Sequence, residues 1–516
     1  MHKLKGLLKV IFGRTTMVFA SLLIQVIILC VTFGWLSEYT VAVYSGFTIL
    51  GAAVVIYIMN EDINSSFKLA WIIPVLVIPV FGTALYIFVN LQVGTKYIKK
   101  RTTDIQTQIA PLLEQNEQVL KNLEEADRSE VGFANYMNHS AGYPIYQNSS
   151  VKYFPIGELK FEQMIQELEK AEKFIFLEYF IVAKGYMWDT ILDILKRKVK
   201  EGVEVRMLYD GMCSLMLLPY KYPEELERYG IKCKIFSQIK PILSTHQNNR
   251  DHRKILVIDG HTAFTGGINL ADEYINRIDR FGHWKDTAVM IKGEAVRSFT
   301  LMFLQMWNIT ERQQEDYAKY VTTPYVAELQ AEDGRGFVLP YGDNPFDSEN
   351  VGKQVYIDVL NRARKYVHIM TPYLILDDEM VEALSYAAKR GVETIIIMPH
   401  KPDKLYAYLL ARTYYKELLD KGVRIYEYTP GFVHAKVFVS DDDKAVVGTV
   451  NLDFRSLYLH FECGAYMFKD PAVFKIEADF RATLDKCQEI TLEDCRKLSP
   501  VKRFLGQVLR LIAPLM

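Results

Sequence analysis

Histidine, lysine and aspartate recur with one spacing at two distant places in the chain, and these residue types are well suited to phosphate chemistry. The spacing is His-x-Lys, four residues, then Asp, and its copies are His252, Lys254 and Asp259, and His434, Lys436 and Asp441. One short pattern is a weak signal, but two copies are not expected by chance. An imidazole attacks phosphorus or transfers a proton, and an ammonium neutralises phosphate oxygens. The copies therefore predict a site that attacks and holds a phosphate.

A Gly-x-x-Asn element follows each copy, at residues 266–269 and 448–451. We expect its last residue, Asn269 or Asn451, to return to the pocket and donate hydrogen bonds to the phosphate. The two aspartates of the motif belong to the catalytic set but stand at strand ends. We therefore expect them to orient turns or lysine side chains rather than to react.

The spacing within each motif fits a β-strand. Residues i and i+2 of a strand share a face, so each histidine projects together with its lysine, whereas Arg253 and Ala435 point away. Where two such strands meet, two imidazoles and two ammoniums surround one phosphate.

The elements that must position these strands also occur twice. Apolar strands are expected at 173–178, 203–210, 231–236 and 252–259, and again at 365–370, 392–399, 423–428 and 434–441. Helical patterns lie between them, and glycines such as Gly202 and Gly391 follow the helices. This alternation predicts an α/β protein with two pseudo-symmetric α/β/α halves packed face to face, at 141–330 and 331–496.

Three charge-free stretches precede the repeat, at 15–37, 39–60 and 69–95. A helix needs about 20 apolar residues to cross a bilayer, so residues 1–95 are expected to form a transmembrane region with two or three crossings. A cleaved signal peptide is the alternative for the first stretch, but its apolar run is too long and no cleavage site stands out.

Prolines and flanking charges refine this expectation. Pro74 and Pro79 predict a kinked helix or a re-entrant segment in the third stretch. Basic residues flank the first stretch and follow the third, which favours an even number of crossings with both flanks inside. We expect a multi-pass protein of the cell membrane whose catalytic part is cytoplasmic.

Two further segments lie outside the repeat. Residues 96–140 are charged and helix-prone, and are interpreted as a connector. Residues 497–516 place Phe504, Val508 and Leu511 on one helical face, which suits a helix on an anionic membrane surface. An amphipathic helix packed on the domain is the equal alternative.

Composition limits the remaining possibilities. The chain has 516 residues, enough for two or more domains, and a net charge of −1, so no global basic charge points to nucleic acid. Its six cysteines lack paired C-x-x-C spacing. They are expected to be reduced, buried thiols, and no metal site is indicated.

The doubled motif and its surroundings resemble the phospholipase D superfamily, and the wider context is similar to bacterial cardiolipin synthases. The resemblance is carried by residues 248–254, 266–274, 284–287, 448–456 and 461–462, and by the apolar segment that begins at 64–74. His460 departs from this pattern, because asparagine is expected before Phe461 and Glu462. The departure puts a local contact in doubt, not the catalytic set.

The resemblance implies a reaction without metal or other cofactor. A phosphatidyl group passes between two phosphatidylglycerol molecules of the bilayer and gives cardiolipin and glycerol, and no nucleic acid is involved. His252 is implied as the nucleophile that forms a phosphohistidine and His434 as the acid and base, although the residues alone show two near-equal copies. Lys254 and Lys436 would stabilise the phosphate oxygens together with the two asparagines.

Each imidazole also needs a carboxylate to orient it. The resemblance offers Asp286 for His252 and Glu462 for His434. A hydrolytic phospholipase D is the nearest alternative function, a phosphodiesterase or nuclease of the same superfamily is less favoured, and a non-enzymatic membrane scaffold is least favoured. The oligomeric state is not indicated.

Other residues are assigned lesser roles. The remaining histidines considered, which have no counterpart in the other copy, are expected to be structural or surface residues: His246, His261, His283, His368 and His400. Tyr143, Tyr146 and Tyr153 are expected in cores rather than at a lipid entrance. Glu178 and Tyr179 close a strand near the expected pocket and are candidates for a supporting role.

Overall fold

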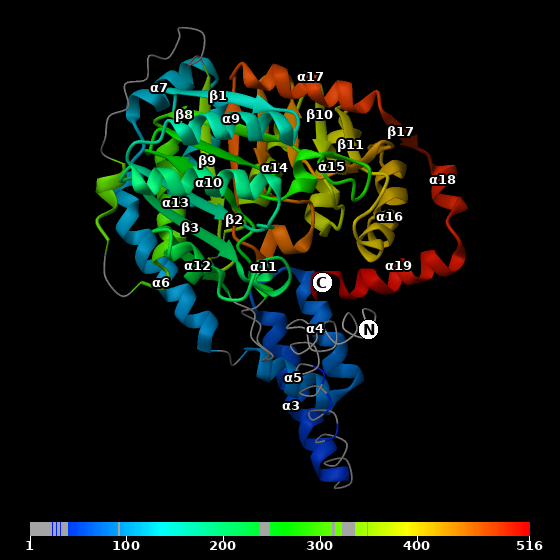
Figure 1. The fold of residues 1–516 in the computed structure, drawn as a ribbon. Coiled ribbons are helices and arrows are strands. Elements are labelled where there is room, and N and C mark those ends of the chain that lie inside the picture. The colour runs from blue at the N-terminus through cyan, green and yellow to red at the C-terminus, as the bar shows by residue number, and fades with distance from the viewer. Residues whose placement is uncertain are drawn as a thin grey trace, which may run out of the picture.

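The computed structural model describes most of the chain: residues 40–90, 93–237, 248–311, 315–321, 336–347 and 349–515, with positions 23, 27 and 31. A body of two sheets and surrounding helices stands above a narrower group of N-terminal helices (Figure 1). The predicted stretch 15–37 lies outside the described residues except for those isolated positions, and so do His246 and Cys30.

The first sheet has seven strands. Their order across the sheet is β1 (Ser149–Phe154), β8 (Ala288–Gly293), β6 (Thr262–Gly266), β5 (Lys254–Ile258), β2 (Phe174–Tyr179), β3 (Glu204–Asp210) and β4 (Lys232–Phe236). Strands β2, β3 and β4 are parallel, because helices connect them, whereas the strands from β5 to β1 pair antiparallel.

The second sheet repeats this order and adds one edge strand. It runs β17 (Cys487–Ile490), β12 (Arg424–Tyr428), β11 (Glu393–Pro399), β10 (Tyr366–Met370), β14 (Val437–Ser440), β15 (Lys444–Gly448), β16 (Glu462–Phe468) and β9 (Phe337–Asp343). Strands β10 to β12 are again parallel and the next four antiparallel. The predicted α/β class and internal repeat are confirmed.

Helices cover the outer face of each sheet. They are α9 (Gly157–Glu169), α10 (Tyr186–Lys200), α11 (Gly211–Met216) and α12 (Tyr222–Glu227) in the first half, and α14 (Val351–Arg362), α15 (Asp378–Lys389) and α16 (Leu405–Asp420) in the second. Helix α18 (Leu492–Lys497) packs on α16 and has no buried residue. Two more, α13 (Val296–Asn308) and α17 (Ala472–Leu484), contribute to the core between the sheets. Gly202 and Gly391 follow α10 and α15 with φ of 93° and 88°, a conformation in which glycine escapes the Cβ clash, so both helices end there.

Strand alternation divides the apolar residues among three cores. In β5, Ile255 and Val257 enter a core shared by both halves, whereas Leu256 and Ile258 face the helices of the first half. The corresponding strand β14 sends Val437 and its i+2 neighbour into the same shared core. The two sheets therefore pack face to face, and each is buried on both sides.

The segment predicted as a connector is part of the folded body. It forms α6 (Val93–Ile109), α7 (Glu117–Ala126) and α8 (Arg128–His139). Ile105 of α6 enters the shared core, and Leu123 and Phe133 enter the outer core of the second half. Its apolar residues therefore pack it against both halves. The sequence interpretation as a connector was based on its many charged residues and did not predict this packing.

The N-terminal helices are α3 (Thr40–Asn60), α4 (Ser65–Val77) and α5 (Pro79–Asn90). Trp71 and Tyr86, which flank the break at Ile78 at similar distances, have ring centroids 5.5 Å apart, so α4 and α5 fold back on each other as a hairpin. The break that the prolines predicted is confirmed. At about 1.5 Å per residue, helices of 13 and 12 residues fall short of the roughly 30 Å hydrocarbon core.

Within the part of the chain that the structure describes, no helix combines the length and apolar character needed to span a bilayer. The predicted crossings at 39–60 and 69–95, and with them the multi-pass arrangement, are therefore unsupported.

Candidate active site

Both His-x-Lys motifs lie at the joint between the halves, and the backbone of each is bonded to the other half. The amide of His252 donates to the carbonyl of Phe461 at 2.9 Å, and the amide of His434 donates to that of Lys285 at 2.7 Å. Just before His434, strand β13 (Gly431–Val433) pairs parallel with β7 (His283–Lys285) of the first half. Neither histidine is therefore positioned by its own half alone.

Carboxylates reach the imidazoles across the same joint. Nδ1 of His252 lies 2.9 Å from both carboxylate oxygens of Glu462, and Nδ1 of His434 lies 2.7 Å from Oδ2 of Asp286. The pairing expected from the resemblance, Asp286 with His252 and Glu462 with His434, is wrong. The reason is the strand pairing. Asp286 directly follows β7, which pairs with β13 just before His434, and Glu462 directly follows Phe461, which bonds the backbone of His252.

These bonds set the chemistry of the rings. A carboxylate accepts the proton of Nδ1, so the lone pair of each neutral imidazole is left on Nε2. His252 and His434 are each 8% or less exposed, so little water competes for them. Each ring is thus oriented to use Nε2 as nucleophile or proton carrier.

The two lysines make the site electropositive. Both side chains are buried, and each ammonium donates to the carbonyl of the histidine two residues before it. Burial lowers the pKa of Lys254 to about 8 and that of Lys436 to about 7. Burial and these lysines hold the pKa of His252 well below its ordinary value and lower that of His434 to about 4. A bound phosphate anion would offset this excess positive charge.

The two motif aspartates bind backbone, as the sequence predicted. Their carboxylates accept from three consecutive amides at 2.7 to 3.0 Å: Asp259 from Glu172, Lys173 and Phe174, and Asp441 from Arg364, Lys365 and Tyr366. Asp259 thus fixes the start of β2, and Asp441 fixes the start of β10. Each aspartate lies at the opposite end of its motif strand from the histidine.

The two asparagines differ. Oδ1 of Asn269 accepts from the amide of Ile181, and Nδ2 donates to the hydroxyl of Tyr274, both at 2.9 Å. Oδ1 of Asn451 is buried and has no hydrogen-bond partner among the described residues. The side chain of Asn269 thus holds the wall of the site, while that of Asn451 is less fully engaged.

Aromatic rings two residues before each carboxylate also line the site; the sequence marked His460 only as a departure from the family pattern and assigned no role to Trp284. The ring of His460 lies 5.5 Å from that of His252, and the ring of Trp284 lies 5.4 Å from that of His434. His460 and Trp284 each stand two residues before the carboxylate, Glu462 or Asp286. An alignment of the two halves of the sequence on their carboxylates would have paired these two rings. Thr449, inside the second Gly-x-x-Asn element, also donates to Glu462.

His460 has a fixed orientation. Nε of Arg455 donates to Nε2 of His460 at 3.2 Å, and Nδ1 faces Oε1 of Glu462 at 3.6 Å. Burial lowers the pKa of His460 to about 3, so this ring is neutral. It presents an N–H towards Glu462, as the amide of the expected asparagine could.

Among the described residues, one group of side chains could offer three ligands to a metal ion: His252, His460 and Glu462. The two motif lysines add positive charge beside this group, which opposes a cation and suits an anion.

The supporting candidates lie in the interior. Glu178 is buried 3.9 Å from Arg253, behind the motif, and Tyr179 accepts from Lys160. Tyr146 bonds Ser298 and Tyr153 bonds Asp479, as expected of core residues. The histidines predicted to be structural or surface residues have partners outside the motifs: His261 contacts Thr262, His283 contacts Tyr428, His368 contacts Glu477 and Glu393, and His400 contacts Glu427.

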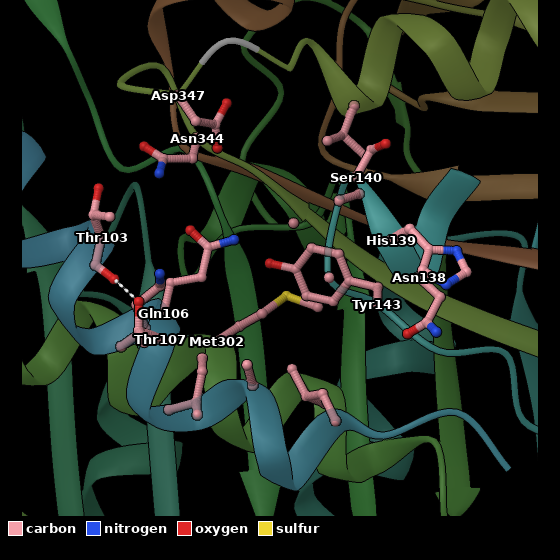
Figure 2. Close-up of a pocket in the computed structure, with 18 residues that line it drawn as sticks. Thr103, Gln106, Thr107, Asn138, His139, Ser140, Tyr143, Met302, Asn344 and Asp347 are labelled. Carbon is pink, nitrogen blue, oxygen red and sulfur yellow. Dashed lines mark hydrogen bonds between the residues drawn. The ribbon is translucent and has the colours of Figure 1, made fainter. Parts of the chain in front are cut away.

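A separate cavity of about 370 Å³ lies beside α6 and has no motif residue in its lining (Figure 2). Tyr143 points into it together with Gln106, Met302 and Asp347. Tyr143 is therefore not at the entrance of the site described above. The five described cysteines are free thiols, three of them buried.

Comparisons with known proteins agree with this architecture. Residues 164–307 and 356–484 match a family described as "Cardiolipin synthase, PLD-like domain", and residues 47–89 match "Phospholipase_D-nuclease N-terminal". An uncharacterized protein of Streptococcus mutans is 51% identical over 462 residues, covering 90% of this chain and 99% of its own.

A cardiolipin synthase of Alkalihalophilus pseudofirmus is 33% identical over 489 residues, which cover 94% of this chain and 96% of that protein. The crystal structure of phosphatidylserine synthase from Haemophilus influenzae Rd KW20 superposes with a TM-score of 0.53 at 14% identity, covering 71% of this chain and 93% of that one. At this identity the likeness shows the fold.

Proposed function

Because the chain belongs to the cardiolipin synthase family of phospholipase D-like proteins, we propose that it transfers a phosphatidyl group between two phosphatidylglycerol molecules. The products are cardiolipin and glycerol. The observation that carries the proposal is the pair of imidazoles, each bonded to a carboxylate of the other half, beside two buried ammoniums.

In the first step, Nε2 of His252 attacks the phosphorus of one phosphatidylglycerol. The phosphorus–nitrogen bond forms while the bond to the glycerol oxygen breaks, and protonated His434 gives its proton to that oxygen. The anionic phosphodiester favours this protonated form, which the free site disfavours. Glu462 stabilises the positive charge that develops on the ring of His252.

In the second step, a hydroxyl of another phosphatidylglycerol attacks the phosphohistidine. His434, now neutral, takes the hydroxyl proton, and the phosphorus–nitrogen bond breaks to free His252. Lys254 and Lys436 balance the charge on the phosphate oxygens throughout. No step needs a metal ion.

The lipid substrate and the N-terminal match support attachment to the cell membrane, with phosphatidylglycerol of the bilayer as partner. We place the catalytic body on the cytoplasmic side, on the strength of the basic residues that flank the N-terminal apolar stretches.

Incubating the purified full chain with phosphatidylglycerol in micelles, in the presence of a chelator, tests the function. We expect cardiolipin and glycerol in equal amounts. Phosphatidic acid in place of cardiolipin would assign the chain to hydrolysis, since water can replace the lipid hydroxyl. Cleavage of oligonucleotides without lipid turnover would assign it to the nucleases.

A further inference from the structure

The last long helix, α19 (Pro500–Ile512), is anchored to the body by one face. Gly506 lies so close to α16 that an added Cβ would be 2.7 Å from a side-chain carbon of Thr413. Arg510 donates to Glu417 at 3.1 Å, and its guanidinium lies 4.3 Å from the centre of the Tyr414 ring. The helix therefore has a fixed orientation relative to the body.

The other face of α19 is apolar and exposed. Its residues recur at helical spacing and are 42% to 68% exposed: Val501, Phe504, Leu505, Val508, Leu511 and Ile512. A contiguous apolar stripe of this kind marks a surface that meets a partner or a membrane. Both sequence interpretations of this segment thus hold in part, because one face packs on the domain and the other is available.

The exposed stripe continues onto neighbouring elements. The residues after α19, Ala513–Leu515, contact α4 of the N-terminal hairpin, whose Leu76 and Val77 are also exposed. Helix α19 packs against α16. The first two residues of α16, Leu405 and Tyr406, are 65% and 46% exposed. Figure 1 shows α19 along the base of the body, where α4 joins it.

This base lies near the second motif. Lys404 directly precedes Leu405, and its ammonium lies 5.1 Å from the centre of the Tyr373 ring. The backbone amide of Lys401, four residues before Leu405, donates to the carbonyl of Gly431 at 3.3 Å, and Gly431 is three residues before His434. The apolar residues that begin α16 therefore lie near the phosphate site.

Cations accompany the apolar stripe. Lys401 and Lys404 near α16, and Lys502 and Arg503 on α19, are exposed. None of these four forms an ion pair with an acidic side chain in the described part of the chain. Apolar residues flanked by unpaired cations suit an anionic bilayer better than a second apolar protein surface.

We propose that the exposed face of α19, with Leu405 and Tyr406, docks on an anionic lipid bilayer and holds the motif histidines near the level of the headgroups. The inference rests on the proposed function only for the identity of the substrate, because the docking itself requires no catalysis.

Hydrogen exchange of the full chain in bilayers tests docking directly. Amides of residues 500–512 should exchange more slowly in phosphatidylglycerol nanodiscs than in phosphatidylcholine nanodiscs. Equal exchange in the two lipids would overturn the proposal. So would slowing that appears without lipid and grows with protein concentration, which would identify a second copy as the occupant.

A kinetic comparison separates docking from catalysis. Phe504→Ser with Val508→Ser should raise the KM for phosphatidylglycerol in vesicles by about tenfold and leave turnover of a short-chain, water-soluble phosphatidylglycerol unchanged. Phe474→Ser is the matched control, because Phe474 is 61% exposed on α17, at the opposite end of the body (Figure 1).

An unchanged KM in vesicles, or an equal effect of the control, would overturn the docking proposal. Absence of turnover on both substrates by the unsubstituted chain would instead refute the proposed function, and the exchange experiment would still decide on docking.

Discussion

The surroundings of His252 and His434 can be compared directly, because the same strand order and the same aspartate cap support both. His252 is bonded to a carboxylate that also accepts from Thr449 and lies beside the polar ring of His460. His434 is bonded to Asp286 and packs between the rings of Trp284 and Tyr274. A duplicated scaffold thus carries two imidazoles in different settings.

This difference indicates that the two histidines can have different chemical roles although the halves share one fold. Glu462 accepts from a side-chain hydroxyl, that of Thr449, whereas the second donor to Asp286 is the backbone amide of Thr287. The extra side-chain bond suits a ring that, in the proposed mechanism, must remain oriented after it is phosphorylated.

His434 packs against the rings of Trp284 and Tyr274, whereas His252 packs against Phe180 and the smaller ring of His460. The larger walls around His434 suit the proposed proton carrier, from which water should be excluded. The proposed division into nucleophile and acid is the functional counterpart of this asymmetry.

The largest expected effects separate the two histidines. His252→Ala and His434→Ala should each lower turnover of phosphatidylglycerol by about a thousandfold or more. A phosphodiester with a nitrophenol leaving group needs no acid, so it should release nitrophenol with His434→Ala but not with His252→Ala. The reverse pattern would exchange the two roles, and full activity of either variant would break the two-histidine scheme. His400→Ala is the control.

Carboxylate substitutions test the crossing between halves. Glu462→Gln and Asp286→Asn should each lower kcat by about a hundredfold, because the amide no longer favours the required tautomer. In a chain that already carries His252→Ala, Glu462→Gln should lower kcat little further. Asp286→Asn should still lower kcat in that chain, because its partner His434 is intact. Coupling of His252 with Asp286 instead would contradict the observed pairing.

The depressed pKa values of the lysines predict a pH dependence of anion binding. Lys436 and Lys254 are protonated below about pH 7 and pH 8 respectively, and lose their charge above these values. Binding of inorganic phosphate, measured by calorimetry, should therefore weaken by about tenfold as the pH rises from 6.5 to 9. Lys436→Met should flatten the lower part of this profile, and a profile unchanged by that substitution would count against the assignment.

The smallest expected effect concerns the ring unique to the His252 side. His460→Asn should change kcat by less than about threefold, because an amide can also donate towards Glu462. His460→Phe removes this donor and should shift the pH profile of kcat as well as lower its maximum. Identical pH profiles for both variants would show that His460 only fills space.

Much of this arrangement could be predicted from the sequence, because it follows from local spacing. The motif strands and the alternation of strands and helices in each repeat depend on neighbours close in the chain. Asp259 was predicted to be structural, but its partners, the amides of residues 172–174, are distant in sequence. The break at Ile78 likewise follows from Pro79, which has no amide to continue the helix.

The rest depends on how the halves meet, which local patterns do not encode. The family resemblance offered Asp286 as the partner of His252, whereas the pairing of Asp251 with Phe461 brings Glu462 to the ring instead. The engagement of Asn269 by Tyr274 and the burial of Leu123 in the second half also arise only on packing.

The central claim is that imidazoles from both halves act on one phosphorus atom, with His252 carrying the intermediate. Phosphohistidine is hydrolysed in acid. The reaction should therefore be quenched with base during turnover, and the peptides of the chain should be analysed by mass spectrometry without acid treatment. We predict a phosphatidyl adduct on His252 that is absent after His252→Ala and that disappears when glycerol is added to the active enzyme. An adduct on His434 alone, or turnover with no adduct on either histidine, would contradict the account.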